Sequence, residues 1–129
     1  DAWTILPEII SKEPLGPVVR QGDEQWGDVV RWSLNALIAA EELGITRDNI
    51  DEMLAGTSNP SINRLLGTEG GLGEMLGLDD GWAARAIAAN GNYGEIFADT
   101  IGEDTIIGLP RGLNALWTEG GLMYAPPFR

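Results

Sequence analysis

Apolar side chains recur every three or four positions between residues 26 and 38, the spacing that places them on one face of an α-helix. The repeating positions are Trp26, Val29, Val30, Leu34, Leu37 and Ile38. Asp23 stands before them as an N-cap residue, and Gly44 follows them as a residue that readily ends a helix. The pattern therefore predicts a long amphipathic helix over 23–44, the strongest helix of the chain.

Shorter helical segments are expected after this helix. Thr46 is a suitable cap for a second helix, which Gly56 would close. A third, short helix is expected from Asn59, because the following Pro60 suits the first helical position. Residues 67–77 hold five glycines and predict a connector with a single helical turn between tight bends.

Two further helices are predicted in the second half of the chain. One begins at 79–80, carries Trp, Ala and Ile on one side, and ends at 90–91. The other covers 92–102, where Asn92 and Glu95 have the spacing of a capping box. Both segments end at a glycine, which is typical of a helix C-terminus.

The two ends of the chain lack helical spacing. Residues 3–10 and 15–20 are rich in Trp, Ile, Val and Thr but are interrupted by prolines, which predicts two short extended or edge-strand segments. Near the other end, 106–110 is expected to be extended and 113–117 to form one or two helical turns. The apolar tail over 122–129 is expected to pack against the body. The predicted fold is therefore mainly α, with two short β segments near the N-terminus.

Charge restricts the partners of the protein. Eight basic residues stand against twenty acidic ones, giving a net charge of -12, and Lys12 is the only lysine. Such a surface repels phosphate backbones and anionic lipid headgroups, and no basic cluster offsets the repulsion locally. Nucleic acid is therefore not expected as a partner. No apolar run approaches the ~20 residues needed to cross a bilayer.

The chain contains neither cysteine nor histidine. This composition removes disulfides, thiolate nucleophiles, zinc–thiolate sites and histidine acid–base catalysis. Gly71-Leu72-Gly73 lacks the preceding strand and the following Lys-Ser/Thr of a P-loop, and the carboxylates lack the spacing of a calcium loop. No acidic pair stands out for glycoside hydrolysis. We therefore predict that the protein is not an enzyme and holds no metal or cofactor.

The chain has five tryptophans, and their helical spacing favours core packing over a stacking platform for sugars or bases. This applies to Trp3, Trp26, Trp82 and Trp117. Trp32 is the exception, because it lies off the main apolar stripe of its helix. We expect Trp32 to be exposed or to face a partner.

The first residues do not have the pattern of a natural start. Asp1-Ala2-Trp3-Thr4-Ile5-Leu6 has no initiator Met and no signal-peptide pattern, and it resembles a strand that is already under way. We therefore expect further residues upstream in the natural protein.

Three stretches carry a family resemblance. In 6–44, Leu-Pro-Glu-Ile-Ile-Ser-Lys-Glu-Pro-Leu-Gly-Pro precedes a long helix that ends in Ala-Ala-Glu-Glu-Leu-Gly. Residues 91–97 read Gly-Asn-Tyr-Gly-Glu-Ile-Phe, and 109–129 read Leu-Pro-Arg-Gly-Leu-Asn-Ala-Leu-Trp and end in Gly-Gly-Leu-Met-Tyr-Ala-Pro-Pro-Phe-Arg. Together they resemble the type II periplasmic binding proteins of amino-acid ABC transporters. The last stretch is similar to the tail of the general L-amino-acid-binding subgroup.

The resemblance implies an α/β parent with two lobes and a ligand cleft between them, of which this chain would be the C-terminal part. Residues 1–22 would end the second lobe and cross the hinge, 23–102 would complete the first lobe, and 103–129 would be a family-specific extension. The implied hinge residues are Ser11, Pro14, Gly16 and Pro17, and the candidates for the cleft edge are Lys12 and Glu13. The residues that hold the ligand's carboxylate and ammonium groups would lie upstream of this chain.

The function implied is that of the substrate-binding component of an ABC-type amino-acid uptake transporter. Its partners would be L-amino acids and the membrane subunits of the transporter, in the periplasm of a Gram-negative bacterium, and the parent would carry a signal peptide. Two alternatives stay open from the residues alone: a free-standing acidic helical interaction module, and a carboxylate-dependent hydrolase. Because the helix over 23–44 would expose an apolar face, we also expect self-association or swapped packing.

Overall fold

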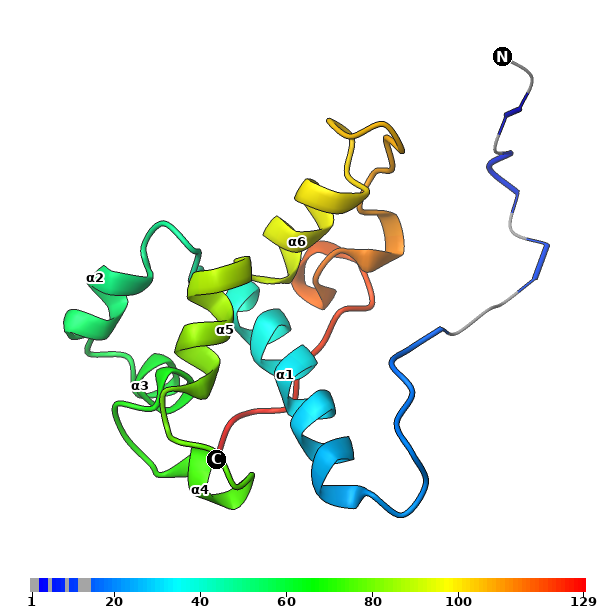
Figure 1. The fold of residues 1–129 in the computed structure, drawn as a ribbon. Helices are drawn as coiled ribbons and strands as arrows, with labels where there is room; N and C mark the ends of the chain where they lie inside the picture. Colours follow the sequence, from blue (N-terminus) through cyan, green and yellow to red (C-terminus); the bar gives the residue numbers. More distant parts are fainter. Residues whose placement is uncertain (1–2, 5, 9, 12–14) are drawn as a thin grey trace.

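The central element is α1 (Glu24–Glu42), and α3, α5 and α6 pack against it (Figure 1). The computed structural model describes residues 3–4, 6–8, 10–11 and 15–129. The Asp23 carboxylate accepts a hydrogen bond from the Trp26 N–H at 3.2 Å, and Gly44, with φ of 69°, turns the chain away after the helix. The predicted long helix is therefore confirmed at both ends.

Two short helices follow, α2 (Ile50–Ala55) and α3 (Pro60–Leu66). The predicted cap of α2 at Thr46 is three residues too early, because Asn49 is the residue that precedes the helix. The Thr46 N–H donates to Asn49 Oδ1 at 2.8 Å, and the Asn49 N–H donates to Thr46 Oγ1 at 3.2 Å. This reciprocal pair closes a turn in place of a first helical turn. In α3 the prediction is confirmed, since the Asn59 side chain caps the helix just before Pro60.

The next three helices are α4 (Leu72–Met75), α5 (Trp82–Asn90) and α6 (Tyr93–Thr100). α4 is the single turn predicted within the glycine-rich connector. α6 has the predicted capping box: Asn92 Oδ1 accepts from the Glu95 N–H, and Glu95 Oε2 accepts from the Asn92 N–H, both at 2.9 Å. The local signal therefore set the start of α6 correctly, whereas α5 begins at Trp82, after the predicted start at 79–80, and no side chain caps α4 or α5.

Turns over 101–108 follow α6, and residues 109–129, which we call the C-terminal strap, then run along the helices. Two short 3-10 turns, η1 (Gly112–Asn114) and η2 (Trp117–Glu119), replace the predicted helical turns over 113–117. The predicted extended segment over 106–110 is wrong at its start, because the Thr105 hydroxyl accepts from the N–H groups of Ile107 and Gly108 and bends the chain.

The core consists of two clusters that lie on different faces of α1. The larger one joins α1, α2, α3 and α5, and the smaller one fixes the C-terminal strap to α1. Buried residues of the larger cluster are Ala36, Ala40, Ile45, Ile50, Ile62, Leu65, Leu66, Trp82, Ala83, Ala84 and Ile87, and those of the smaller cluster are Ile38, Leu116 and Ala125. The predicted packing of the apolar tail is confirmed through Ala125 and Phe128.

Residues 15–22 lead into α1, and Pro17 and Val19 border the first half of this helix (Figure 1). The N-terminal segment is described for residues 3–4, 6–8, 10–11 and 15–22. Its described residues form no strand and no backbone hydrogen bond before Arg20, so the two predicted β segments are not formed within this chain. Trp3, Leu6, Ile10, Leu15 and Val18 are each 69–96% exposed. A strand needs a neighbour to pair its N–H and C=O groups, and the described part of the chain offers none.

Candidate functional site

The structure describes three of the predicted hinge residues, all on the N-terminal segment, and of these Pro17 borders a groove along α1. Ser11, Gly16 and Pro17 are exposed on the N-terminal segment, whereas Pro14 and the two predicted cleft-edge residues, Lys12 and Glu13, lie outside the described residues. The structure therefore does not test whether the predicted site residues come together, and their roles stay predictions.

A partly buried ion pair joins α1 to the C-terminal strap. Arg111 donates from Nη1 to Glu41 Oε1 at 2.7 Å and from Nη2 to Glu41 Oε2 at 3.1 Å, which is the two-pronged geometry that suits a guanidinium and a carboxylate. The side chains are 27% and 14% exposed. Arg111 also donates to the Asn114 carbonyl at 2.7 Å, so the same guanidinium holds the η1 turn.

The surroundings of this pair explain the glycine-containing sequence over 91–97. The Arg111 guanidinium lies 5.5 Å from the ring centre of Tyr93 and 5.3 Å from that of Phe97, within cation–π range. A Cβ on Gly94 would come within 2.7 Å of both Arg111 Nη1 and Glu41 Oε1. The pair therefore packs directly on the backbone of α6, and a side chain at this position would force the ends of both charged side chains to shift.

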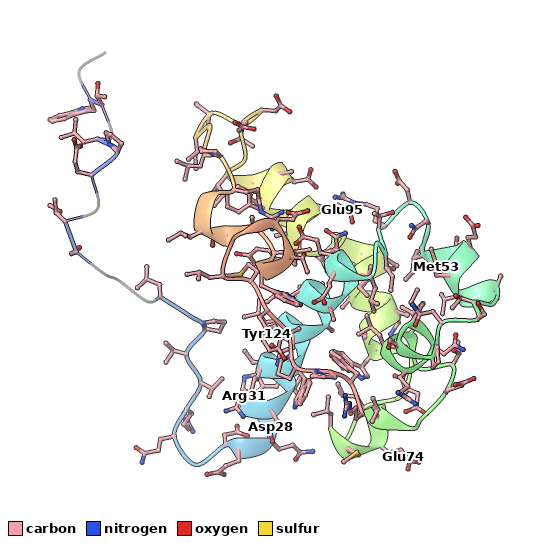
Figure 2. All side chains as sticks on the ribbon, turned by 180° about the vertical axis from the view of Figure 1, so that it is seen from behind. Asp28, Arg31, Met53, Glu74, Glu95 and Tyr124 are labelled. Atoms are coloured by element: carbon pink, nitrogen blue, oxygen red, sulfur yellow. The ribbon has the colours of Figure 1, made fainter. Side chains whose placement is uncertain are left out.

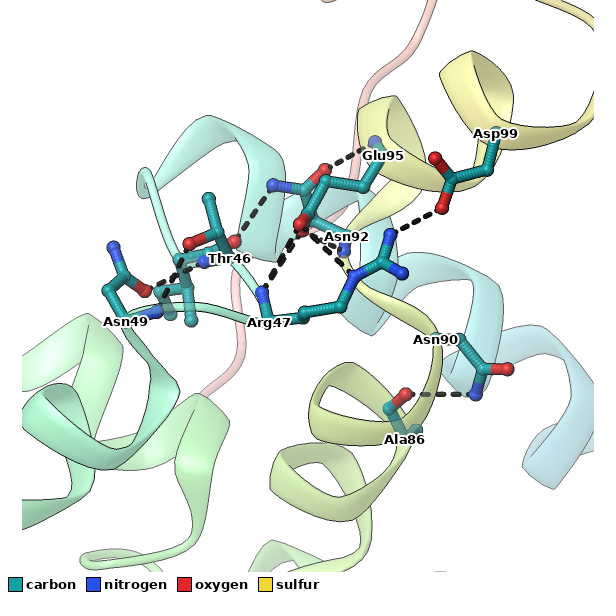
Figure 3. Close-up of polar contacts among 9 residues, drawn as sticks. Thr46, Arg47, Asn49, Ala86, Asn90, Asn92, Glu95 and Asp99 are labelled. Carbon is teal, nitrogen blue, oxygen red and sulfur yellow. Dashed lines mark hydrogen bonds and ion pairs between the residues drawn. The ribbon is translucent and has the colours of Figure 1, made fainter. Parts of the chain in front are cut away.

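A second polar cluster connects the end of α1 with α6 (Figure 3). Arg47 pairs with Asp99 and with Glu95, whose Oε2 also accepts from the Arg47 N–H at 3.1 Å. The buried Asn92 side chain donates to the Ile45 carbonyl at 2.8 Å. The capping-box residues of α6 thus also hold the turn after α1 in place.

Two sets of exposed ion pairs shift the pKa values of their members. Hydrogen bonding to Asp99 raises the pKa of Arg47, and hydrogen bonding to Asp79 raises that of Arg85. In return, Arg85 lowers the pKa of Asp79 below its ordinary value. These are solvent-facing structural pairs rather than a proton-transfer site, because none lies in a cleft beside a second reactive group.

The burial of the tryptophans differs from the prediction at most positions. Trp82 is buried as expected, but Trp3, Trp26 and Trp117 are exposed by 95%, 55% and 52%, so their predicted core positions are wrong. Trp32 was expected to be exposed, yet it is half-buried and meets Phe128 edge to face at 5.1 Å. The face of α1 that enters the larger core carries Trp32, Ala36 and Ala40, spaced four residues apart.

A groove lies between the second half of α1, α3 and the C-terminal strap, and we call it the strap groove. Its volume is about 510 Å³. Trp117 and Tyr124 stand on its strap side with ring centres 6.1 Å apart and an interplanar angle of 75°. The other lining residues are Ala39, Glu42, Leu43, Ser61, Arg64, Leu65, Ala125, Pro126, Pro127, Phe128 and Arg129.

The described residues contain neither a metal-binding group nor a membrane-spanning helix. Within residues 15–129 and the described positions before them, no group of three acidic side chains is placed to hold a metal ion. In the same part of the chain, no helix combines the length and the apolar character that a membrane span requires.

The chain is similar to named binding proteins over nearly its whole length. It is 68% identical over 97% of its residues to the glutamate/glutamine/aspartate/asparagine-binding protein BztA of Rhodobacter capsulatus. It is 57% identical over its full length to the general L-amino acid-binding periplasmic protein AapJ of Rhizobium johnstonii, and 50% identical over 98% to the putative amino-acid ABC transporter-binding protein YhdW of Escherichia coli. No family model matches the chain.

A solved structure agrees with these relatives. It is an ABC transporter/periplasmic binding protein from Brucella ovis with glutathione bound, and it matches 96% of this chain with a TM-score of 0.91 and 55% sequence identity. The chain is homologous to part of these periplasmic binding proteins. The resemblance inferred from the three sequence stretches is thereby confirmed. The relatives are named as binding proteins and not as enzymes, as predicted.

The extent of the match is limited. The chain spans about 37% of the length of the BztA and YhdW relatives, 38% of AapJ and 39% of the matched structure.

Sequence reasoning missed the Arg111–Glu41 pair and the strap groove. Arg111 belongs to a stretch that carried the resemblance, but its partner lies seventy residues away, and no local spacing connects the two.

Proposed function

We propose that this chain is the C-terminal part of the solute-binding component of an ABC-type amino-acid uptake transporter, acting in the periplasm of a Gram-negative bacterium. The observation that carries the proposal is 68% identity over 97% of the chain to a relative named as an amino-acid-binding protein. The printed names of the relatives support L-amino acids as the ligand class. Glutathione, named with the matched structure, has a free α-amino and α-carboxylate group at its glutamyl end and shares that chemistry.

The test is calorimetry with a panel of L-amino acids, comparing the whole protein with this chain alone. We expect the whole protein to bind at least one amino acid and this chain to bind none tightly, because the implied carboxylate- and ammonium-binding residues are absent from it. D-amino acids serve as the control ligands. The proposal fails if the whole protein binds no amino acid in the panel.

The domain assignments belong to the same proposal. Residues 1–22 would end the second lobe and carry the hinge, with Ser11, Pro14, Gly16 and Pro17 as hinge positions and Lys12 and Glu13 at the cleft edge. Residues 23–102 would complete the first lobe and 103–129 would extend it. Among the residues that the structure describes before Arg20, the backbone makes no hydrogen bond to other backbone groups, which supports a strand that forms only when the rest of the protein supplies a neighbour. The whole protein would then deliver its ligand to the membrane subunits of the transporter.

In isolation, this chain is expected to self-associate through its N-terminal segment. Leu15 and Val18 are 92% and 93% exposed on an extended backbone without hydrogen-bond partners, an arrangement that favours pairing with a second copy. Light scattering coupled to size-exclusion chromatography should give a mass that rises with concentration above that of one chain. The double change Leu15→Asp and Val18→Asp should restore the monomer, because charge on an edge strand opposes pairing.

The matched control for this experiment is Leu122→Asp. Leu122 is also apolar and 67% exposed, but it lies on the C-terminal strap. This variant should associate as the unmodified chain does. A monomer at high concentration, or equal loss of association in both kinds of variant, would contradict the proposal.

A further inference from the structure

Asn90 is the one asparagine of the chain that a glycine follows. In an Asn-Gly pair, the glycine amide nitrogen attacks the asparagine side-chain carbonyl carbon more readily than in other pairs, because the glycine has no side chain to hinder the approach. The pair lies at the joint between α5, which ends at Asn90, and α6, which begins after its cap residue Asn92. The geometry of this joint therefore decides whether the pair reacts.

Both reacting groups of the pair are engaged in other hydrogen bonds. The Gly91 N–H donates to the Ile87 carbonyl at 2.7 Å, at the C-terminal end of α5. The Asn90 side chain turns back along the helix, and its Nδ2 donates to the Ala86 carbonyl at 3.0 Å (Figure 3). The nucleophile thus keeps its proton in a hydrogen bond, while the carbon that it would attack is directed to the preceding turn.

Contacts made by the next residues keep the joint closed. Asn92 and Glu95 form the capping box of α6, and the buried Asn92 side chain also donates to the Ile45 carbonyl at 2.8 Å. Figure 2 shows Glu95 near the start of α6, from the side opposite to Figure 1. A Cβ on Gly91 would come within 2.9 Å of three Glu95 atoms, so the Gly91 backbone packs on that side chain.

We propose that Asn90 is a latent deamidation site, which the closed joint between α5 and α6 protects from reaction. When the joint opens, solvent base takes the proton of the Gly91 amide, and the nitrogen forms a bond to Asn90 Cγ. Asn90 Nδ2 takes up a proton from water and leaves as ammonia, so that a five-membered imide ring remains. Water then opens the ring at either carbonyl and gives aspartate or isoaspartate, and no oxidant or reductant is consumed.

The products do not fit the closed joint. Either product replaces the amide donor to the Ala86 carbonyl with a carboxylate, at the helix end that already carries partial negative charge. Isoaspartate also adds one methylene to the main chain beside Gly91, where the Glu95 side chain leaves no space. Reaction at Asn90 therefore prevents the joint from closing again. This chemistry needs only α5, α6 and water, so it does not depend on the proposed transport function.

The test is to incubate the whole protein at mildly alkaline pH and to follow the peptide over 86–111, which cleavage after arginine releases, by mass spectrometry. In guanidinium chloride, which opens the joint, Asn90 should react before Asn92, which Tyr93 follows in the same peptide. In the folded protein, deamidation at Asn90 should be at least about 100-fold slower, because it requires local opening. Asn90→Gln should remove the reaction at this position.

Asn92→Ala removes the cap of α6 and the bond to Ile45, so it should raise the rate at Asn90 in the folded protein about tenfold. The matched control is Asn59→Ala, which removes the same kind of cap from α3 and should leave the rate within about twofold of that of the unmodified protein. Circular dichroism shows whether each variant is folded. If Asn92→Ala unfolds, Glu95→Ala removes the other half of the capping box and should accelerate the reaction in its place.

Three results would overturn the proposal. Equal acceleration by Asn59→Ala and by folded Asn92→Ala would mean that the reaction requires unfolding of the whole chain rather than opening of the joint. Equal rates at Asn90 with and without guanidinium chloride would mean that the closed joint gives no protection. Faster reaction at Asn92 than at Asn90 in the unfolded protein would mean that the Asn-Gly pair is not the reactive site.

Discussion

Gly67→Ala is expected to lower the free energy of unfolding by about 2–5 kcal/mol. Gly67 ends α3 with φ of 76°, a left-handed conformation that costs a residue with a Cβ about 1–2 kcal/mol. The added Cβ would also lie 1.9 Å from the Asp80 carbonyl oxygen, so the backbone before α5 would have to move. The midpoint of thermal unfolding should fall by about 8–20 °C.

Gly71→Ala is the matched control for this prediction. Gly71 is also left-handed, with φ of 61°, but an added Cβ would meet no atom within 4 Å. Its cost should therefore be limited to the conformational term of about 1–2 kcal/mol. Thermal and urea unfolding followed by circular dichroism measure both variants. If both variants lost the same free energy of unfolding, the close approach of Gly67 to Asp80 would add nothing to the cost of the substitution.

Arg111→Met is expected to destabilise the protein by about 2–3 kcal/mol, since it leaves the Glu41 carboxylate mostly buried without its partner. The figure lies below the 3–5 kcal/mol typical of fully buried pairs because Arg111 retains 27% exposure. Glu41→Gln should cost a similar amount. Because both single changes break the same contact, the double variant should lose less than the sum of the two.

Arg31→Met provides the comparison for an exposed pair. Arg31 and Asp28 lie 3.4 Å apart on the surface of α1, with side chains 70% and 51% exposed. Pairs of this kind contribute little to stability, so this variant should unfold as the unmodified chain does. Urea unfolding of Arg111→Met, Glu41→Gln and the double variant gives the coupling energy between Arg111 and Glu41. The same measurement on Arg31→Met gives the comparison. An additive double variant, or an Arg111→Met variant as stable as Arg31→Met, would contradict the prediction.

In α1, the largest apolar side chains do not mark the face that enters the core. The predicted apolar stripe is buried only in part: Ile38 is buried, but Trp26 and Leu34 are exposed. The core instead meets Ala36 and Ala40, whose small side chains allow neighbouring helices to approach closely. Periodicity identifies a helix, but it does not decide which of two apolar faces its neighbours will cover.

The sequence by itself determined the helices and most of their ends, because Asp23, Asn59, Asn92 and the terminating glycines act on backbone groups within about four residues. It also determined the family resemblance, through runs of residues that need no knowledge of contacts. Only the tertiary structure decided that Arg111 meets Glu41, that Trp32 packs on Phe128, and that Arg64 and Arg129 line one groove. Those contacts depend on the path of the chain between distant segments, which no local spacing specifies.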